Sequence, residues 1–375
     1  MTTSPRPARY VMIGGFLGAG KTTSILRAAE WLTGRGLRVG LVTNDQAGGL
    51  VDTAIVKAHA LAVEEIAGGC FCCRFNSLVE AADRLARDSA PDILLAEPVG
   101  SCTDLVATVS LPLGRIYGDR FTIAPVSVVV DPLRALRILG IDGSGGSFSP
   151  NVTYIYRKQL EEAEIVVINK CDLVSPAQRA ALRTALAAAL PAARVFEISA
   201  RDGTGLEDWF GAILDTPSVP RPIEQIDYDR YADGEALLGW LNAEIRLGAL
   251  DGPDWDGNSL LVRLLDAIRG AVARQGHEIA HLKGTLTLEG DDYELAAANL
   301  VRSASSPELS HRLTDPLDAG RLLINLRAEA DPALLETAVR EAIDDTRGDL
   351  PATIVHCEHF RPGRPVPTHR IPSLS

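Results

Sequence analysis

The chain has 375 residues, of which 46% are hydrophobic and 23% charged, a composition typical of a globular protein with room for two domains. Its formal net charge of −12 argues against non-specific binding to nucleic acid or to an anionic membrane surface, because both would repel it. The polar stretch 1–10 lacks the apolar core of a secretory signal, and no run reaches the roughly 20 apolar residues of a membrane span.

Short apolar runs alternate with helical stretches over the first 216 residues. The predicted elements in chain order are a strand at 10–14, a helix at 22–35, and strands at 37–43, 93–96, 126–130, 165–168 and 195–198. Continuous apolar strands separated by helices predict a mostly parallel sheet with helices on both faces, that is, an α/β fold.

Three prolines in residues 216–222 break any helix and predict a linker. The expected domains are therefore 9–215, a linker at 216–228, and 229–375. Beyond the linker we expect a strand at 236–247, a helix at 259–274, two or three strands between 278 and 326, a helix at 332–346 and a strand at 352–357. This order predicts a smaller α+β domain, with a ferredoxin-like arrangement as one option.

The loop after the first strand carries a phosphate-binding motif. Residues 15–22 fit G-x-x-x-x-G-K-[ST] between a predicted strand and a predicted helix, which indicates a P-loop NTPase. The glycines let backbone N–H groups face phosphate oxygens, Lys21 is expected to act catalytically on the β- and γ-phosphates, and Thr22 to hold Mg²⁺. The alternative is a glycine-rich turn. The residues expected to contact the nucleotide here are Gly15, Gly18, Ala19, Gly20, Lys21, Thr22 and Thr23.

A second nucleotide motif, Asn169-Lys170-Cys171-Asp172, follows an apolar strand. The Asp172 carboxylate can accept hydrogen bonds from the guanine N1 and amino groups, which adenine does not offer. Ser199 and Ala200 stand at the next strand end and complete the expected base site. We therefore expect GTP rather than ATP.

Acidic residues end two further strands. Asp45 follows the strand at 37–43, and Glu97 begins the stretch Glu97-Pro-Val-Gly100. Both are candidate catalytic residues, because a carboxylate there can bind Mg²⁺ directly or through water, or position the attacking water. Gly100 can bring its N–H to the γ-phosphate. Asp131 is a weaker candidate that can simply cap a helix begun by Pro132.

The stretch 65–73 reads Glu-Ile-Ala-Gly-Gly-Cys-Phe-Cys-Cys. Thiolates of Cys70, Cys72 and Cys73 can converge on one soft cation, such as Zn²⁺, Co²⁺ or Cu(I), with Glu65 as a candidate fourth ligand. Three thiolates leave one position open, as a cargo metal requires. The alternatives are a buried turn and a redox pair, since Cys70 and Cys73 satisfy Cys-x-x-Cys. Clustered cysteines favour reduced thiols, and hence the cytoplasm.

Together these motifs resemble the CobW family of metallochaperone P-loop GTPases, relatives of the hydrogenase and urease nickel-insertion GTPases. Residues 15–23 resemble that family's P-loop, 65–73 its Glu followed by Gly-Cys-x-Cys-Cys, 97–100 its Glu-x-x-Gly, and 169–172 its base motif. The resemblance covers residues 9–215; beyond them only the domain order agrees. Asp45 matches only as the acidic position, because the family commonly has Asn-Glu-Phe-Gly there. A His-rich tract is missing, which leaves the metal open.

The resemblance implies GTP hydrolysis coupled to metal delivery, with GTP, GDP, a transition metal and a client metalloprotein or corrinoid-pathway protein as partners, and with a homodimer as one option. The alternative is a metal- or redox-sensing switch that gates a corrinoid enzyme without delivering metal. A small-molecule P-loop kinase is disfavoured by the guanine motif. In the C-terminal domain, the spacing of His356, Cys357 and His359 allows a second metal site.

Overall fold

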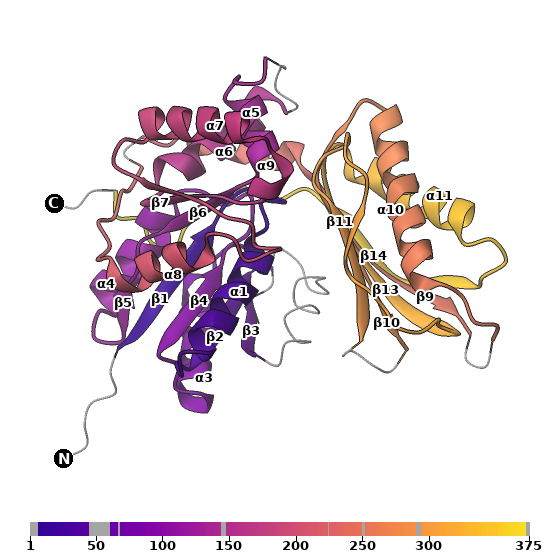
Figure 1. Cartoon of the computed structure of the whole chain (residues 1–375), viewed down its shortest axis with the longest axis horizontal. Helices are drawn as coiled ribbons and strands as arrows, with labels where there is room; N and C mark the ends of the chain where they lie inside the picture. The colour runs from indigo at the N-terminus through magenta and orange to yellow at the C-terminus, as the bar shows by residue number, and fades with distance from the viewer. Residues whose placement is uncertain are drawn as a thin grey trace. The chain divides into compact units, whose positions relative to one another are not determined.

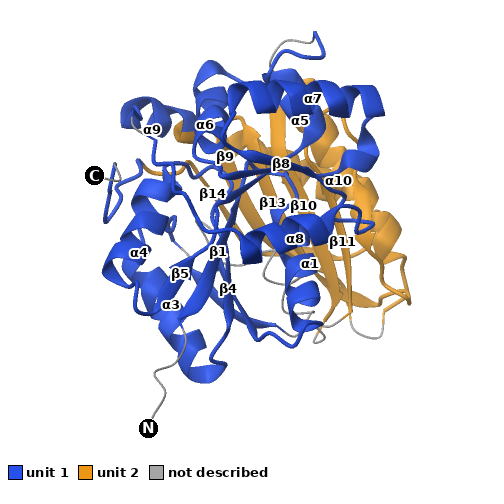
Figure 2. Cartoon of the chain, turned by 60° about the vertical axis from the view of Figure 1, so that its left-hand side comes forward, with its two compact units in different colours: residues 1–46, 61–234, 364–375 blue, residues 47–60, 235–363 orange. Residues whose placement is uncertain are grey.

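The computed structural model describes residues 7–44, 61–66, 68–143, 148–223, 225–249, 252–289 and 294–372. The chain forms two compact units (Figures 1 and 2). Among the described residues, unit 1 contains 7–44, 61–234 and 364–372, and unit 2 contains 235–363. Among the described residues, the chain passes from unit 1 into unit 2 after residue 234 and returns to unit 1 after residue 363.

Within its described residues, unit 1 is built on an eight-stranded parallel sheet of order β3-β2-β4-β1-β6-β7-β8, with β5 also paired to β1. The strands β2, β4, β6 and β7 are buried at every position, as expected for a sheet covered on both faces. The strands are β1 (Ala8–Gly14), β2 (Val39–Asn44), β3 (Ala62–Ile66), β4 (Ile93–Glu97), β5 (Phe121–Ile123), β6 (Ser127–Val130), β7 (Ile165–Ile168) and β8 (Arg194–Glu197).

Helices connect these strands, and their ends follow local sequence signals. Ser175 and Gln178 form a capping box at the start of one helix, and Asp131 caps another that begins with Pro132. The helices of unit 1 are α1 (Lys21–Thr33), α3 (Phe75–Asp88), η1 (Val106–Ser110), α4 (Leu111–Ile116), α5 (Pro132–Ile138), α6 (Pro150–Glu161), η2 (Cys171–Leu173), α7 (Pro176–Ala189), α8 (Leu206–Asp215) and, running into unit 2, α9 (Tyr228–Leu237). The predicted α/β fold is confirmed, although the strands β3 and β5 were not predicted.

Unit 2 is an antiparallel sheet of order β12-β11-β10-β13-β9-β14 with two helices. Strands β14, β9, β13 and β10, with their two crossover helices, form the ferredoxin-like β-α-β-β-α-β arrangement, and β11 and β12 extend its edge. The elements are β9 (Gly239–Gly248), α10 (Gly257–Arg274), β10 (Glu278–Leu288), β11 (Leu295–Leu300), β12 (Glu308–His311), β13 (Ala319–Glu329), α11 (Pro332–Thr346) and β14 (Ala352–Phe360). One apolar cluster joins the sheet to α10 and α11.

Two predictions for this region were wrong in detail. Residues 236 and 237 end α9 rather than opening a strand. The described residues between 278 and 326 contribute to four strands rather than two or three. Strand β11 is rich in alanine, and β12 is a short polar edge strand, so neither shows the alternation by which a strand is recognised.

The unit boundaries also differ from the predicted ranges. Residues 216–234 belong to unit 1, where the hydroxyl of Tyr231 accepts from the Thr103 amide. Residues 364–372, expected in the C-terminal domain, also pack in unit 1. Long-range contacts decide both boundaries, and proline content near residue 216 could not reveal them.

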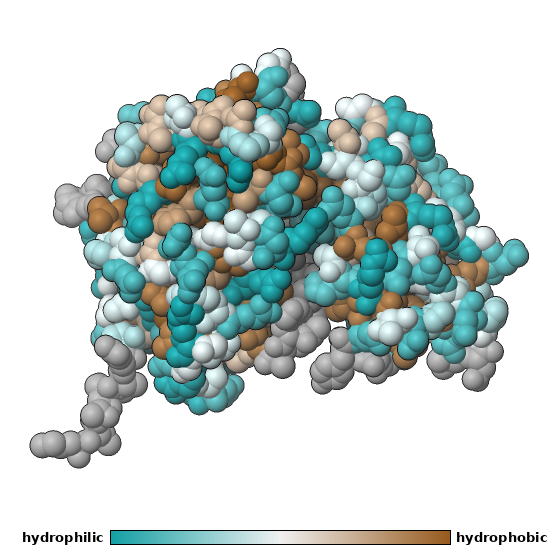
Figure 3. Space-filling view, viewed as in Figure 1, coloured by the Kyte–Doolittle hydropathy of each residue, from teal (hydrophilic) through white to brown (hydrophobic). Residues whose placement is uncertain are grey.

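The face drawn in Figure 3 carries broad hydrophilic areas with hydrophobic groups between them. Among the helices of the described residues, none combines the length and the apolar character needed to cross a membrane.

Candidate functional site

The loop between β1 and α1 has the backbone of a phosphate-binding loop. Gly15, Gly18 and Gly20 have φ angles of 132°, 77° and 92°, which side chains other than glycine rarely adopt. A Cβ at Gly15 would lie 2.2 Å from the Val129 carbonyl oxygen, and one at Gly20 would lie 2.4 Å from Asn169 Nδ2. Gly15 and Gly20 are therefore required both for conformation and for space, and α1 begins directly after Gly20, where the N-terminal end of a helix favours an anion.

The predicted magnesium and phosphate residues meet at the start of α1. Thr22 Oγ1 donates a 2.9 Å hydrogen bond to Glu97 Oε1, and both side chains are buried. A Cβ at Gly100 would lie 3.0 Å from Lys21 Nζ, so the Lys21 ammonium lies directly beside the Gly100 backbone. Asp45, the second predicted acid, lies outside the described residues. Thr23 is an exposed residue of α1.

Asn169 joins the base motif to the P-loop. Its Nδ2 donates to the Ala19 carbonyl at 3.0 Å, and its Oδ1 accepts from the Ala200 amide at 3.0 Å. Ser199 and Ala200 are both buried next to it. Asp172 in η2 is exposed, so its carboxylate is accessible to a guanine base. Asn169 is thus joined to Ala200 and to the P-loop residue Ala19, while Asp172 keeps its predicted role as an expectation.

Lys170 makes a second link between the same two loops. Its backbone has a left-handed φ of 54°. Its Nζ donates hydrogen bonds to the Gly18 carbonyl at 2.7 Å and to Asp131 Oδ2 at 3.0 Å. Asp131 is the N-cap of α5 and accepts from the Arg134 amide. Burial acts to raise the pKa of Asp131, but the charges of Lys170 and Arg134 outweigh it and hold that pKa below its ordinary value. Asp131 therefore caps a helix, as the alternative reading held, and also fixes Lys170.

The thiol loop between β3 and α3 is folded around one buried side chain. The Asn44 amide donates to the carbonyls of Ile66 at 2.9 Å and Gly69 at 2.7 Å, and it accepts from the Phe71 N–H at 2.8 Å. Gly68 and Gly69 have φ angles of 77° and 146°, which permit the tight turn. The loop's shape is therefore set by Asn44 at the end of β2.

The three sulfur atoms of this loop converge, as predicted. Cys70 Sγ lies 2.9 Å from Cys72 Sγ and 3.2 Å from Cys73 Sγ, and the latter two are 3.8 Å apart. Cys70 and Cys72 are buried, and Cys73 is half-buried. All six cysteines of the chain are described, and each is free of any disulfide. Among the described residues, these three cysteines form the one set of at least three potential metal ligands with donor atoms all within 4.8 Å of one another.

The three thiols differ in pKa. Hydrogen bonding with Cys102, Cys72 and Cys73 lowers the pKa of Cys70 well below its ordinary value. Hydrogen bonding with Cys70 raises the pKa of Cys72 well above the ordinary value and the pKa of Cys73 to about 11. Of the three thiols, Cys70 therefore holds its proton least tightly, and a thiolate is the form that binds a soft cation.

Cys102 contacts the cluster, and Glu65 is the predicted fourth ligand. Cys102, buried in the segment after Gly100, is hydrogen-bonded with Cys70 but lies outside the set of three. Glu65, the predicted fourth ligand, is also outside that set, yet its Oε1 is buried and has no hydrogen-bond partner among the described residues. A buried carboxylate oxygen without a donor is costly unless a ligand satisfies it.

The histidines of unit 2 do not form a comparable set within the described residues. His359 Nε2 lies 3.0 Å from Glu336 Oε2, and His356 is exposed on β14. His356 and Cys357 are consecutive on a strand, so their side chains point to opposite faces.

Sequence reasoning assigned no role to three residues of this site: Asn44, Cys102 and Arg134. The side chain of Arg134 is buried and bonds the Leu17 carbonyl of the P-loop. Asn44 stands directly before the predicted acid Asp45, and Cys102 stands shortly after Glu97-x-x-Gly100. The closeness of Asn44 and Cys102 to these motifs in the sequence could have indicated a role at the site. Their hydrogen-bond partners, however, lie in other segments of the chain.

The model of the CobW/HypB/UreG nucleotide-binding domain matches residues 9–197 of this chain. The zinc chaperone YeiR of Escherichia coli is 30% identical over 178 residues, which are 47% of this chain and 50% of that protein. The zinc chaperone CobW of a Sinorhizobium species is 27% identical over 193 residues, 46% of this chain and 53% of its own. The chain thus spans about half the length of these relatives.

Among solved structures, Zn(II)-bound YjiA GTPase from E. coli aligns over 91% of this chain and 99% of its own, with 16% identity and a TM-score of 0.36. A likeness of that degree carries no argument about function.

Proposed function

The chain belongs to the CobW/HypB/UreG family, and we propose that it is a GTP-hydrolysing metallochaperone that delivers a transition metal ion to a client metalloprotein or metal-cofactor pathway. Guanine choice would rest on Asp172, with Asn169, Lys170, Ser199 and Ala200 shaping the base site. Residues 15–23 and Gly100 would hold the phosphates. The hydrogen bonds that join Asn169 and Lys170 to the P-loop, and Ala200 to Asn169, support one shared nucleotide site.

Magnesium fits the start of α1. The Thr22 hydroxyl and the Glu97 carboxylate, 2.9 Å apart, offer the oxygen ligands that this cation prefers. When bound, Mg²⁺ neutralises charge on the β- and γ-phosphates. Lys21 would add positive charge there, Glu97 would hold the cation or orient the attacking water, and Asp45 is proposed for the same work from the end of β2.

The transition metal is the cargo. Cys70, Cys72 and Cys73 would bind it through sulfur, and the fourth position would be taken by Glu65, Cys102 or a group of the client. Zinc is the first choice because the relatives above are named zinc chaperones, and tetrahedral sulfur coordination suits it. Co²⁺ and Cu(I) remain alternatives by ligand preference.

One observation carries the coupling of GTP to metal. The short segment from Glu97 to Cys102 contacts the P-loop helix at one end, through Thr22, and the thiol cluster at the other, through Cys70. Gln159 Nε2 holds the middle of the segment by donating to the carbonyls of Gly100 at 2.9 Å and Cys102 at 2.8 Å. A shift of Glu97 on loss of the γ-phosphate would therefore act directly on the metal ligands.

Residues 9–215 would form the GTPase domain, and unit 2 would dock the client. The protein would act in the cytoplasm. The alternative is a sensor that gates a corrinoid enzyme without releasing its metal. Transfer separates the two: a chaperone loses its ion to an apo-client on GTP hydrolysis, whereas a sensor keeps it.

Metal titration in each nucleotide state tests the proposal. Under strict reduction, the protein should bind about one Zn²⁺, with an affinity that differs roughly 5- to 150-fold between the states bound to a GTP analogue and to GDP. The triple Cys70/Cys72/Cys73→Ser variant should lose metal and coupling but keep GTP binding. Cys357→Ser, a free thiol of unit 2, is the matched control. Equal isotherms in both states would remove the coupling, and metal retained by the triple variant would place the site elsewhere.

A further inference from the structure

The last described residues of the chain, 364–372, run across the thiol loop of unit 1 without forming a helix or a strand. The Val366 N–H donates to Cys73 Sγ at 3.2 Å. The Thr368 N–H donates to the Cys72 carbonyl at 2.9 Å, and its hydroxyl donates to the Cys73 carbonyl at 3.3 Å. This C-terminal tail thus holds two of the three thiol residues.

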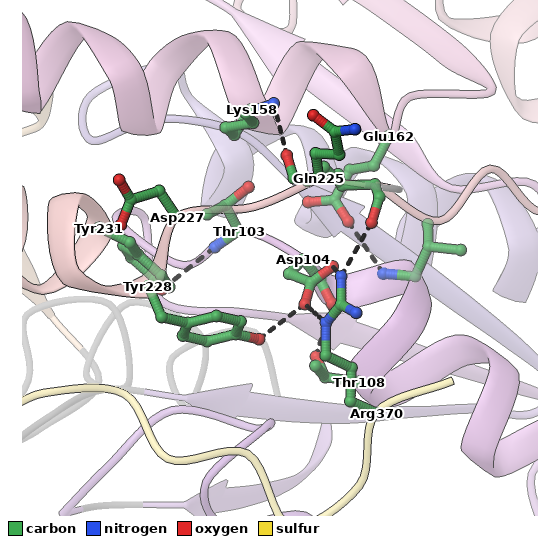
Figure 4. A network of polar contacts seen from close by, with 12 residues as sticks. Thr103, Asp104, Thr108, Lys158, Glu162, Gln225, Asp227, Tyr228, Tyr231 and Arg370 are labelled. Atoms are coloured by element: carbon green, nitrogen blue, oxygen red, sulfur yellow. Dashed lines mark hydrogen bonds and ion pairs between the residues drawn. The ribbon is translucent and has the colours of Figure 1, made fainter. Parts of the chain in front are cut away.

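A buried anchor holds the tail in this place. Arg370 Nε donates to Asp104 Oδ2 at 2.7 Å, and the Tyr228 hydroxyl donates to the same oxygen at 2.6 Å (Figure 4). Asp104 is fully buried and has a left-handed φ of 64°, a conformation that asparagine and aspartate adopt more readily than most residues. Beside the anchor, the Ile371 N–H donates to the Ala107 carbonyl at 2.8 Å. A buried ion pair with a third hydrogen bond is costly to break by removal of one partner.

The tail lies on the accessible side of the cluster. Cys73 is the half-buried thiol, whereas Cys70 and Cys72 are buried, so Cys73 is the most accessible of the three to a metal ion or an acceptor thiol. Next to it, the His369 ring packs edge-on against Phe75 with ring centres 4.9 Å apart. An N–H that donates to a thiolate sulfur stabilises its negative charge and orients the ligand, as outer-shell partners of metal sites do.

We propose that residues 364–372 are a structural part of the thiol site: the Val366 amide positions the Cys73 sulfur for the metal, and the anchored tail retains the metal until it detaches. The inference rests on the proposed metal site and adds a positioning residue and a barrier to exchange. It predicts that metal leaves slowly while Arg370 is bound to Asp104.

Two substitutions at one position give the sharpest test. Val366→Pro deletes the N–H, and because residue 366 lies between Pro365 and Pro367 the extended backbone tolerates it. Val366→Ala keeps the N–H and removes only a side chain that is 69% exposed. With Zn²⁺ as the probe, the proline variant should bind about 10- to 100-fold more weakly, whereas the alanine variant should match the unmodified protein. Equal affinities of the two variants would overturn the role of the amide.

Removal of all residues after Gly363, and separately Arg370→Gln, test the barrier. Both should speed zinc release to a colorimetric chelator at least about tenfold and, in metal-free protein, speed alkylation of Cys73 by iodoacetamide, while GTP affinity stays unchanged. Unchanged alkylation rates in both variants would overturn the barrier. The alkylation experiment needs no metal, so it judges the tail even if the unmodified protein binds no zinc, a result that would instead refute the metallochaperone.

Discussion

The Thr22 hydroxyl and the Glu97 carboxylate form a 2.9 Å hydrogen bond inside unit 1, although β4 and α1 reach this point from different parts of the chain. Thr43 on β2 pairs with Glu97 on one side and with Glu65 on the other. The phosphate loop, the Glu97 segment and the thiol loop therefore all leave the carboxyl edge of one parallel sheet, where ligands of such folds bind.

Glu97→Gln should keep GTP binding but lower the turnover number about 100-fold or more, because the amide neither binds Mg²⁺ as a carboxylate does nor orients water equally well. The turnover number is measured from steady-state phosphate release at saturating GTP and Mg²⁺. Glu197→Gln, which changes a carboxylate at the end of β8 that pairs with Arg179 and Arg183, is the matched control. A normal turnover number would transfer the role to Asp45.

Asp172→Asn should shift nucleotide choice from guanine to xanthine, since an amide can donate to the xanthine 2-carbonyl where the carboxylate had accepted from guanine. GTP affinity should fall on the order of 100-fold, as expected for the loss of hydrogen bonds to a charged group. Competition binding with GTP, xanthosine triphosphate and ATP measures this preference. Asp208→Asn, at an exposed position of α8, should change nothing. Equal affinity of the unmodified protein for ATP and GTP would rule out the guanine site.

Asn44→Ala should weaken zinc binding without removing a ligand. The loop would lose hydrogen bonds to Ile66, Gly69 and Phe71, and buried backbone groups left unpaired should cost about 1–3 kcal/mol of stability. Zinc titration combined with urea unfolding measures both effects. A folded variant that binds zinc as tightly as the unmodified protein would show that the thiol loop keeps its shape without Asn44.

Zinc binding should release about two protons near pH 7.5. Hydrogen bonding with neighbouring thiols lowers the pKa of Cys70, whereas hydrogen bonding with Cys70 raises the pKa of Cys73 to about 11 and also raises that of Cys72, so Cys72 and Cys73 hold their protons more tightly than Cys70 does. Binding through three thiolates must expel the protons of Cys72 and Cys73, so affinity rises with pH. Calorimetry in buffers of different ionisation enthalpy counts them. Release of no protons would exclude binding through all three sulfurs.

Stability should fall as pH rises because of Glu162. Burial raises the pKa of Glu162 to about 8, so the folded state binds this proton more tightly than the unfolded chain, whose carboxyl titrates near pH 4.5. The contribution of the protonated form is complete below about pH 4.5 and is lost as pH rises through 8. Urea unfolding at pH 5 to 8 should show the decline. Glu162→Gln should flatten it, and Glu161→Gln, its exposed neighbour, should not; an equal slope in both variants would assign the decline to other groups.

Local chemistry allowed much of this protein to be predicted. The strands β1, β4, β6 and β7 are recognisable as largely apolar runs. The P-loop and the base motif are short contiguous stretches, so their residue types can be recognised without knowledge of the fold. Glycines at 15 and 20 encode their own backbone angles. Three cysteines in four positions converge because the loop between them is too short to separate them.

Other features depended on the folded chain. Cys102 meets Cys70, Asn44 folds the thiol loop, and Val366 reaches Cys73 from the other end of the sequence. These residues carry no period or motif, because each acts through a partner distant in the chain, and only the packing of the sheet and its loops brings the partners within hydrogen-bonding distance. The residue types therefore show which chemical groups are available to the site, whereas long-range packing brings particular groups into contact.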